Sequence, residues 1–371
     1  MFACVTVAYG ILFAVAVGAI KPADSNFKML RFSRLPVTIL LILILSPAPV
    51  SAEPLDLYMG EAAVASQEVS ERKSVLPQAL KQVLQKLSGL RDFDEYPLVD
   101  ESLKIADSIV VSFYYRNQQQ MQADGSMRNE LRLVAKFSEP AVNDLVKSLE
   151  LPLWQPERGT TEIWVVVDDG LNRRIFPVEF QYSWDAMDRM AAERGLPVTW
   201  PTADEDGQYP VDEQLLWGGY TEDLLGSGRG GVMVAAARRE GREWSLRINL
   251  AYQEQNWTWR SRDVDLQLLL TESVQQAADL IGAANSIAAA DRGSRLYELT
   301  VSGINGAEAY SRCLSYLQGL SVVDRISVHS ALAGKVRYHL HLNALPQYLE
   351  ETLDAGRVLE RDEPGGDYYL R

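Results

Sequence analysis

Apolar residues at two different spacings organise the first part of the chain. Between residues 70 and 88 they fall on one helical stripe, which predicts a helix that ends at Gly89. Between residues 131 and 137 apolar and basic residues alternate, which predicts a half-buried strand. The other predicted elements are a strand over 55–65, a helix around 97–107, a strand over 108–115 and a helix over 139–149. The order is β-α-β-β-α, and the segment EIWVVVDDG would supply a following strand.

The middle of the chain begins with strand-helix alternation and ends with consecutive strands. The short apolar run at 162–167 is typical of a strand in a buried parallel sheet. The elements predicted after it are a helix over 183–194, a strand at 197–200, a helical piece at 212–216, strands at 231–237, 245–252 and 258–266, and a helix over 271–286. This order predicts a mixed sheet flanked by helices.

The last part of the chain repeats the element order of the first part. Its predicted elements are a strand over 296–304, a helix over 307–317, a hairpin of 323–330 and 335–342, a helix over 345–359 and a strand at 368–370. That order, β-α-β-β-α-β, is ferredoxin-like. We therefore predict an α+β / α/β protein in which ferredoxin-like units, 53–158 and 295–371, flank a central mixed-sheet α/β unit, 159–290.

Residues 29–52 have the pattern of a secretory signal. Arg31 and Arg34 precede an apolar run over 35–45, and the small residues Val50 and Ala52 follow that run. A basic start, an apolar core and small residues before the cleavage site are the three parts of such a signal. We predict that Met29 is the true start, that cleavage occurs after Ala52 and that the mature protein is periplasmic.

The segment before Met29 has two interpretations. Residues 1–28 are either an extension upstream of the true start codon or a membrane segment that would tether the protein. Both place the remainder of the chain outside the cytoplasm, because the basic residues after the first apolar run stay on the cytoplasmic side. No cysteine directly follows Ala52, so we expect no stable lipid anchor.

The net charge and the cysteine content bear on the partners and on the disulfides that the protein can have. The whole chain has 36 basic and 50 acidic side chains and a net charge of −14. Residues 1–52 hold four basic side chains and one acidic side chain, so the remaining 319 residues carry −17. Nucleic-acid-binding proteins usually present a basic face, so we expect no nucleic-acid partner. The remaining cysteine, Cys313, has apolar neighbours at helical spacing, which predicts a buried thiol without a disulfide.

Two sequence stretches resemble a known family. The segment LDLYMGEAAVASQEVSERKSVLPQALKQVLQKLSG after the signal, and WGGY at 217–220 before VMVAAARREG, resemble the bacterial secreted family called domain of unknown function 2066, over residues 53–290. The resemblance implies an exported protein of Gram-negative bacteria and brings no activity. More distantly, VMVAAAR, SLRINLAY and NWTWRSR are similar in topology to the α/β domains of curli-secretion and penicillin-binding-protein-activator lipoproteins.

Two short motifs could belong to a site or to a turn. Gly226 to Gly231 can be written G-x-G-x-x-G, but these glycines follow a helix-like segment and precede a strand. A dinucleotide site needs the reverse order, so we interpret them as a turn. Asp168 and Asp169 end an apolar strand, where α/β sheets bind ligands and where paired carboxylates could hold a cation. Asp-Asp-Gly is also an ordinary turn, and Arg173 and Arg174 could neutralise the pair.

All three histidines lie in the predicted C-terminal hairpin. His339 and His341 lie on one face of a strand, because they are two residues apart. With a three-residue loop over 332–334, His329 would lie opposite Arg337 on the same outward face. Three imidazoles there could bind Zn²⁺ or Cu²⁺, although diagonal neighbours are about 7–8 Å apart. The alternative is a polar sheet face that a domain or a partner covers.

No catalytic set is evident in the sequence. It has no P-loop, no H-E-x-x-H, and no G-x-S-x-G before the histidines, so we expect no cofactor, and the sequence leaves the question of an enzymatic activity open while favouring a non-enzymatic role. Four tryptophans could line a ligand or partner surface or could pack in the core: Trp217, Trp244, Trp257 and Trp259. We predict a non-enzymatic module that binds an envelope protein or a cell-wall component. The alternative is a metal-binding protein or metal-dependent hydrolase that uses the histidines or Asp168 and Asp169.

Overall fold

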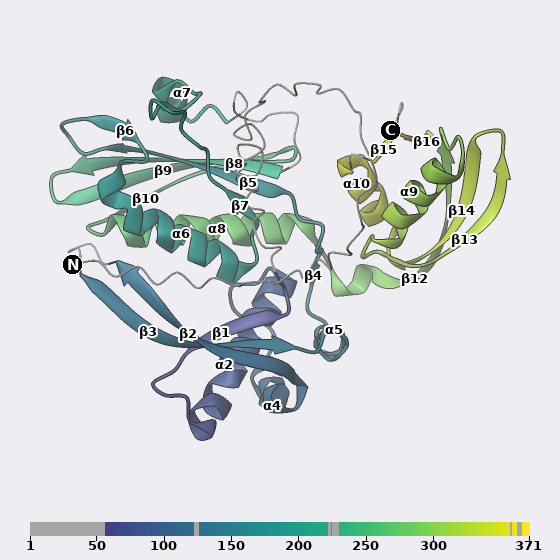
Figure 1. Cartoon of the computed structure of the whole chain (residues 1–371), viewed down its shortest axis with the longest axis horizontal. Helices are drawn as coiled ribbons and strands as arrows, with labels where there is room; N and C mark the ends of the chain where they lie inside the picture. The colour runs from purple at the N-terminus through teal and green to yellow at the C-terminus, as the bar shows by residue number, and fades with distance from the viewer. Residues whose placement is uncertain (1–55, 122–125, 222–223, 225–229, 357, 362–365) are drawn as a thin grey trace, which may run out of the picture. The chain divides into compact units, whose positions relative to one another are not determined.

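A computed structural model describes residues 56–371, except for 122–125, 222–223, 225–229, 357 and 362–365. The predicted targeting segment therefore lies outside the described residues, and the described chain belongs to one unit that begins at Pro54. Helices and strands are mixed along the whole of it, in the α+β class that the sequence predicts (Figure 1). Within the described part, no helix combines the length and the apolar character that a membrane span requires.

The first sheet follows the predicted β-α-β-β-α order. Its strand β3 pairs antiparallel with β1 on one side and β2 on the other. The elements are β1 (Met59–Ala63), α2 (Val69–Ser88), α3 (Val99–Ser102), a 3-10 turn (Leu103–Ile105), α4 (Ala106–Ile109), β2 (Val110–Met121), β3 (Met127–Phe137) and α5 (Glu139–Ser148). Helix α2 ends at Gly89, whose φ of 76° is the left-handed conformation that favours glycine.

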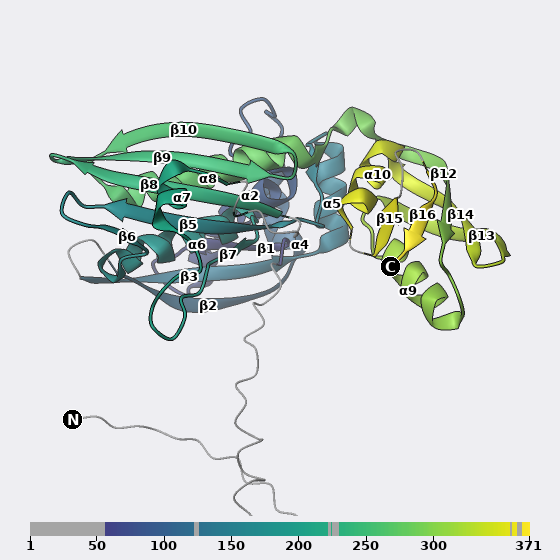
Figure 2. The same cartoon turned by 90° about the horizontal axis from the view of Figure 1, so that it is seen from above.

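The central sheet is mixed, as predicted. Strand β5 pairs parallel with β8, while β8, β9 and β10 form an antiparallel meander (Figure 2). The elements are β5 (Thr160–Asp168), β6 (Arg173–Ile175), a 3-10 turn (Val178–Phe180), α6 (Gln181–Arg194), β7 (Val198–Thr199), α7 (Glu213–Gly218), β8 (Gly230–Glu240), β9 (Glu243–Tyr252), β10 (Gln255–Asp263) and α8 (Leu266–Asn285). The two-stranded pair of β4 (Leu153–Trp154) and β11 (Ser286–Ile287) lies outside this sheet.

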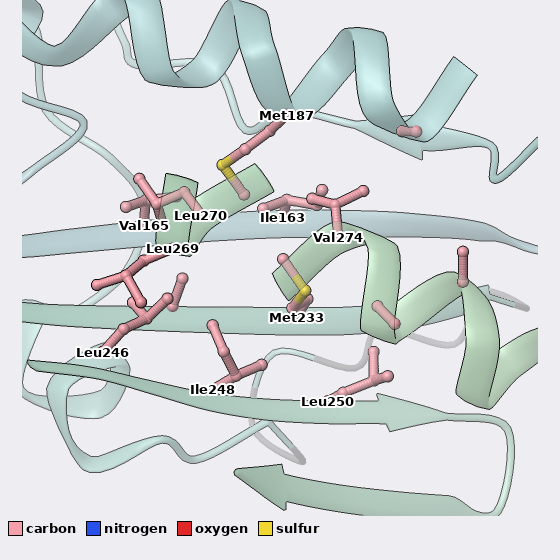
Figure 3. Close-up of a cluster of buried hydrophobic side chains, with 14 of the residues drawn as sticks. Ile163, Val165, Met187, Met233, Leu246, Ile248, Leu250, Leu269, Leu270 and Val274 are labelled. Carbon is pink, nitrogen blue, oxygen red and sulfur yellow. The ribbon is translucent and has the colours of Figure 1, made fainter. Parts of the chain in front are cut away.

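Helices α6 and α8 cover one face of the central sheet. Figure 3 shows Met187 of α6 and Val274 of α8 among the apolar side chains of β5, β8 and β9. These side chains belong to the largest apolar cluster in the described chain, whose members are nearly all below 5% exposed. Helix α7 buries Leu216 against the other face, beside Trp164 and Val234. Both faces of β5 and β8 are therefore buried, which explains their continuous apolar runs.

The C-terminal sheet has the ferredoxin-like strand order that the element order predicts, but its edge differs, because β16 runs parallel to β12 and an unpredicted strand, β15, pairs with β16. Strand β12 lies between β14, its antiparallel neighbour, and β16, its parallel neighbour, and β13 lies outside β14. The elements are β12 (Arg292–Ser302), α9 (Ala307–Gln318), β13 (Val323–Leu332), β14 (Lys335–Ala344), α10 (Pro346–Ala355), β15 (Leu359–Arg361) and β16 (Tyr368–Leu370), with a 3-10 turn (Ala289–Asp291) before β12. Cys313 is fully buried here, as predicted.

Helices α9 and α10 lie on one face of this C-terminal sheet and leave the other face uncovered (Figure 1). Along β14 the buried residues alternate with Arg337, His339 and His341, which point away from the helices. The uncovered face therefore carries the histidines that the sequence singles out. We call it the open face, and its central residues are Glu298, His329, Arg337, His339 and His341.

Several elements differ from the predicted ones: β4, β11 and β15 are not predicted, and the helix predicted over 345–359 spans Pro346–Ala355. Two further differences have local reasons. The sequence does not predict β6, because Arg173–Ile175 is short and contains two arginines. The strand predicted at 258–266 ends at Asp263, since the Asp265 carboxylate accepts the amides of Gln267 and Leu268 and begins α8 there. The strand EIWVVVDDG belongs to the central sheet.

Candidate functional site

Asp168, at the carboxyl end of β5, is surrounded by arginines. Its Oδ2 lies 3.4 Å from Arg238 Nε and 3.7 Å from Arg173 Nη2. Both guanidinium groups also lie over the ring of Trp217, at 4.8 and 4.3 Å from its centroid. Arg173 further approaches Glu213 of α7 at 3.6 Å. The Asp168 carboxylate is thus one half of a charge network that packs on Trp217.

Asp169 has a complete set of donors of its own. Its Oδ1 accepts the amides of Leu171 and Asn172, each at 2.8 Å, and its Oδ2 accepts Arg174 Nη2 at 3.0 Å. The amides of Asn172 and Leu171, together with Arg174, hold the pKa of Asp169 below its usual value. Asp168 and Asp169 belong to opposite faces of the sheet, because they are consecutive in an extended segment. A cation shared between them would therefore have to displace the arginines and also reorient one side chain.

A pocket of about 420 Å³ lies beside Asp169, on the face that α6 and α8 cover. Its lining residues come from the ends of β5, β8, β9 and β10 and from the starts of α6 and α8: Asp169, Phe180, Tyr182, Arg239, Trp244, Val264, Asp265 and Leu266. The volume falls in the range of small-ligand pockets. Its position, outside the carboxyl end of a parallel strand, is where open α/β sheets bind ligands.

The pocket wall is aromatic. Phe180 meets the edge of Trp244 with ring centroids 5.6 Å apart, and Tyr182 lies 6.3 Å from Phe180. Trp244 is only 4% exposed, so it forms the floor, whereas Val264 on the rim is 66% exposed. Burial raises the pKa of the Tyr182 hydroxyl. The wall can therefore accept an apolar or aromatic group whose entry passes Val264.

The charged residues of the pocket differ in how far they are already engaged. Asp169 is fully hydrogen-bonded, and Asp265 caps α8. Arg239 donates its Nε to the carbonyl of Gly241 at 3.1 Å and lies over Trp244 at 5.1 Å. Within the described residues Arg239 has no carboxylate partner. Its terminal amino groups are therefore the charge that this pocket offers to a ligand.

The four tryptophans that the sequence singles out do not form one surface. Trp244 of β9 and Trp257 and Trp259 of β10 share the helix-covered face of the central sheet. Trp217 packs on the opposite face with α7. Trp257 and Trp259 are partly buried against the main apolar cluster, so packing accounts for most of their surface.

The open face brings two of the three histidines together. His339 lies directly opposite Glu298 in the pairing of β14 with β12, and its Nε2 is 3.3 Å from Glu298 Oε2. The ring of His329 stacks on that of His339, with centroids 4.4 Å apart. One potential ligand atom from each of Glu298, His329 and His339 lies within 4.8 Å of the other two. His341 is two residues further along β14, opposite Arg325 and Leu296, and is outside this group.

A bulge at His329 explains this proximity. The sequence places His329 opposite Arg337 across a three-residue loop, which is wrong, because Leu332 pairs with Lys335 and leaves a two-residue loop. Ser330 then pairs with Arg337, and the bulge between Val328 and Ser330 makes His329 the extra residue. The shorter loop shifts the strand register by one residue, and the bulge shifts it back. Val328 therefore still lies opposite Tyr338, as the sequence predicts.

Sequence reasoning missed Glu298. Its signal was present in the alternation of β12, where Leu299 and Val301 are buried and Glu298 is exposed. Only the pairing of β12 with β14 places it opposite His339. Arg337 also reaches this carboxylate, with its Nε 3.4 Å from Glu298 Oε1. The glycine motif, in contrast, lies mostly outside the described residues, and only Gly230 and Gly231 are seen, at the start of β8.

Comparison with known families yields one match. A family model described as Domain of unknown function (DUF8605) matches residues 52–155, which include the first sheet and α5. No curated protein and no solved structure matches the chain. The resemblance to domain of unknown function 2066 over residues 53–290 is therefore not confirmed, whereas the presence of an uncharacterised domain is consistent with it.

Proposed function

We propose that this chain is an exported, non-enzymatic binding protein of the Gram-negative envelope, and that its ligand is an extended segment of another envelope protein. The observation that carries the proposal is the aromatic pocket with Arg239 on its wall. An apolar side chain would enter between Phe180 and Val264, and an adjacent carboxylate would pair with Arg239. The partner is therefore a peptide segment that carries both groups.

A peptide fits this pocket better than a sugar or a reacting substrate. Sugar sites usually offer the open face of an aromatic ring, but Trp244 is 4% exposed and Arg239 lies over it. Both carboxylates of the pocket are held by protein donors, so neither is positioned as a free acid or base. The pocket thus favours binding over catalysis.

Export rests on the sequence of residues 29–52. The matched family model begins at residue 52, and the unit that contains the described chain begins at Pro54, which agrees with a boundary near Ala52. N-terminal sequencing of the protein recovered from a periplasmic fraction would test it. We expect Glu53 as the first residue, and a chain that starts at Met1 or Met29 would contradict the proposal.

A labelled peptide that ends in phenylalanine tests the pocket directly. Its C-terminal residue supplies an aromatic ring next to a carboxylate, and the same peptide with a C-terminal amide lacks the charge. We expect the carboxylate form to bind at least about tenfold more tightly in fluorescence anisotropy, since a charge-assisted hydrogen bond contributes about 1.5–3 kcal/mol. Arg239→Gln should remove that difference between the two peptides.

Two matched variants separate the pocket from the rest of the surface. Val264→Lys places a charge on the rim and should abolish binding of both peptides. Val69→Lys makes the same change at a 55% exposed valine at the start of α2 and should leave binding unchanged. Failure of both peptides to bind, or an equal loss in the two lysine variants, would overturn the proposal.

A further inference from the structure

The open face presents three potential metal ligands in a row across three adjacent strands. Glu298 comes from β12, His339 from β14 and His329 from β13, and the neighbouring pairs are in direct contact. None of them belongs to the apolar cluster beneath α9 and α10. Their arrangement is therefore not a consequence of core packing, and the central pocket does not include them.

We propose that Glu298, His329 and His339 bind one divalent transition-metal cation of the Zn²⁺ or Cu²⁺ class. Two ligands of a tetrahedral ion with bonds of about 2.0–2.1 Å are separated by about 3.4 Å. The 3.3 Å between His339 Nε2 and Glu298 Oε2 already matches that separation. The three ligand atoms lie within 4.8 Å of one another, and the His329 ring has to turn out of its stack on His339 to direct a nitrogen at the same ion.

The ligand types define the class of cation. Imidazole nitrogens favour zinc, copper and nickel over calcium and magnesium, which prefer oxygen ligands. Two histidines and one carboxylate leave one or more coordination positions for water, because the site faces solvent. Copper should bind more tightly than zinc, in accordance with the general order of divalent affinities.

The two carboxylate oxygens of Glu298 have different partners, Arg337 and His339. Arg337 Nε holds Oε1 at 3.4 Å, which leaves Oε2 directed toward His339. Groups that orient a ligand in this way are a common feature of metal sites. The positive charge of Arg337 also repels a cation, so we expect a site of moderate affinity. The register shift between Val328 and Ser330 places His329 in a bulge, and its ring stacks on that of His339.

The experiment is a calorimetric titration of the full chain, without a histidine tag, with Zn²⁺ alone and then with Cu²⁺ alone. We expect one equivalent of each ion to bind. His339→Asn, His329→Asn and Glu298→Gln should each weaken zinc binding by at least about tenfold, because even groups that only orient ligands contribute that much. His341→Asn is the matched control: it removes an imidazole from the same face but outside the group, and should leave affinity unchanged.

A second readout excludes loss of binding through misfolding. The metal-free melting temperature of each variant should equal that of the wild type, because all three side chains are at least partly exposed. Added zinc should raise the melting temperature of the wild type and of His341→Asn. It should not raise the melting temperature of His329→Asn or His339→Asn. The proposal fails if His341→Asn loses zinc as strongly as His339→Asn, or if folded wild-type protein binds no zinc. The metal-site proposal does not depend on peptide binding at the central pocket. The His329, His339 and Glu298 variants should therefore still bind the peptide.

Discussion

The end of the central sheet and the open face of the C-terminal sheet contain similar side chains but use them differently. At the end of β5, Asp168 lies between two arginines that pack on Trp217, and Asp169 accepts two amides of its own loop and the Arg174 side chain of β6. On the open face, Glu298 pairs with Arg337 through one oxygen and faces His339 through the other. A carboxylate with a complete set of protein donors stabilises its loop, whereas one that faces an imidazole retains the capacity to bind a cation.

Burial strengthens the contrast between the two regions. The aromatic floor of the central pocket is nearly inaccessible, with Trp244 4% exposed, whereas the His339 side chain is 31% exposed. Removal of a buried side chain from the floor of the central pocket should therefore lower stability, whereas removal of a side chain from the open face should affect metal binding and leave stability nearly unchanged.

The largest effect should come from Trp244→Ala. The substitution removes a buried aromatic side chain beneath Phe180 and Arg239, and we expect the free energy of unfolding to fall by about 3–5 kcal/mol. His339→Ala, measured without metal, should change it by less than about 0.5 kcal/mol. Urea unfolding of the two variants and the wild type provides the measurement. Similar losses in the two variants would show that the open face is also part of the structural framework.

A smaller effect should follow from removing one carboxylate in each region. Asp168→Ala leaves Arg173 and Arg238 beside Trp217 without their shared acceptor, and we expect a loss of about 1–2 kcal/mol in the free energy of unfolding. Glu298→Ala breaks only exposed pairs and should cost at most about 0.5 kcal/mol in the absence of metal. If Glu298→Ala is the more destabilising variant, the carboxylate of the open face has a structural role.

The sequence predicted the order of elements more reliably than the contacts between them. Apolar spacing predicts both helix α2 and the hairpin of β13 and β14, and Gly89 predicts where α2 ends. These features depend on residues that are close together in the chain. The proximity of Glu298 to His339 depends on strand pairing between residues that are 41 positions apart in the chain, which a periodic pattern does not specify. The sequence analysis singled out His339 at one end of that contact and missed Glu298 at the other.

The histidines illustrate how two local errors can cancel. The predicted loop was one residue too long, and the bulge at His329 was not predicted. Each error shifts the strand register by one residue in the opposite direction, so the predicted register beyond the bulge is correct. The predicted group contained His341 instead of Glu298, because residues two apart on one strand share a face without being in contact. At the central sheet the pattern located Asp168 and Asp169 at the carboxyl end of β5 but did not indicate their separate sets of donors.

Arg337→Gln should increase the zinc affinity of the open face. The substitution removes a positive charge a few ångströms from the proposed ion, and we expect affinity to rise about threefold to tenfold at low ionic strength, with a smaller gain in added salt. The lost pair with Glu298 is exposed and should contribute little. Lys335→Gln is the control, since it makes the same charge change at the other end of β14, where Lys335 pairs with Asp367. Equal affinity in the two variants would mean that Arg337 does not repel the ion.

The smallest effect should be the pH dependence that Asp169 gives to stability. Its donors lower its pKa in the folded protein, so its contribution is fully present above the ordinary value of 3.8 and is lost as the pH falls through the lower folded value. Asp169→Asn keeps an oxygen for the amides of Leu171 and Asn172 but removes the charge. The wild type should therefore melt at a higher temperature than the variant at pH 7, and the difference should shrink below about pH 3.8. A difference that grows on acidification would mean that the Asp169 carboxylate is strained in its loop, and the contrast between the two regions would then have to be abandoned.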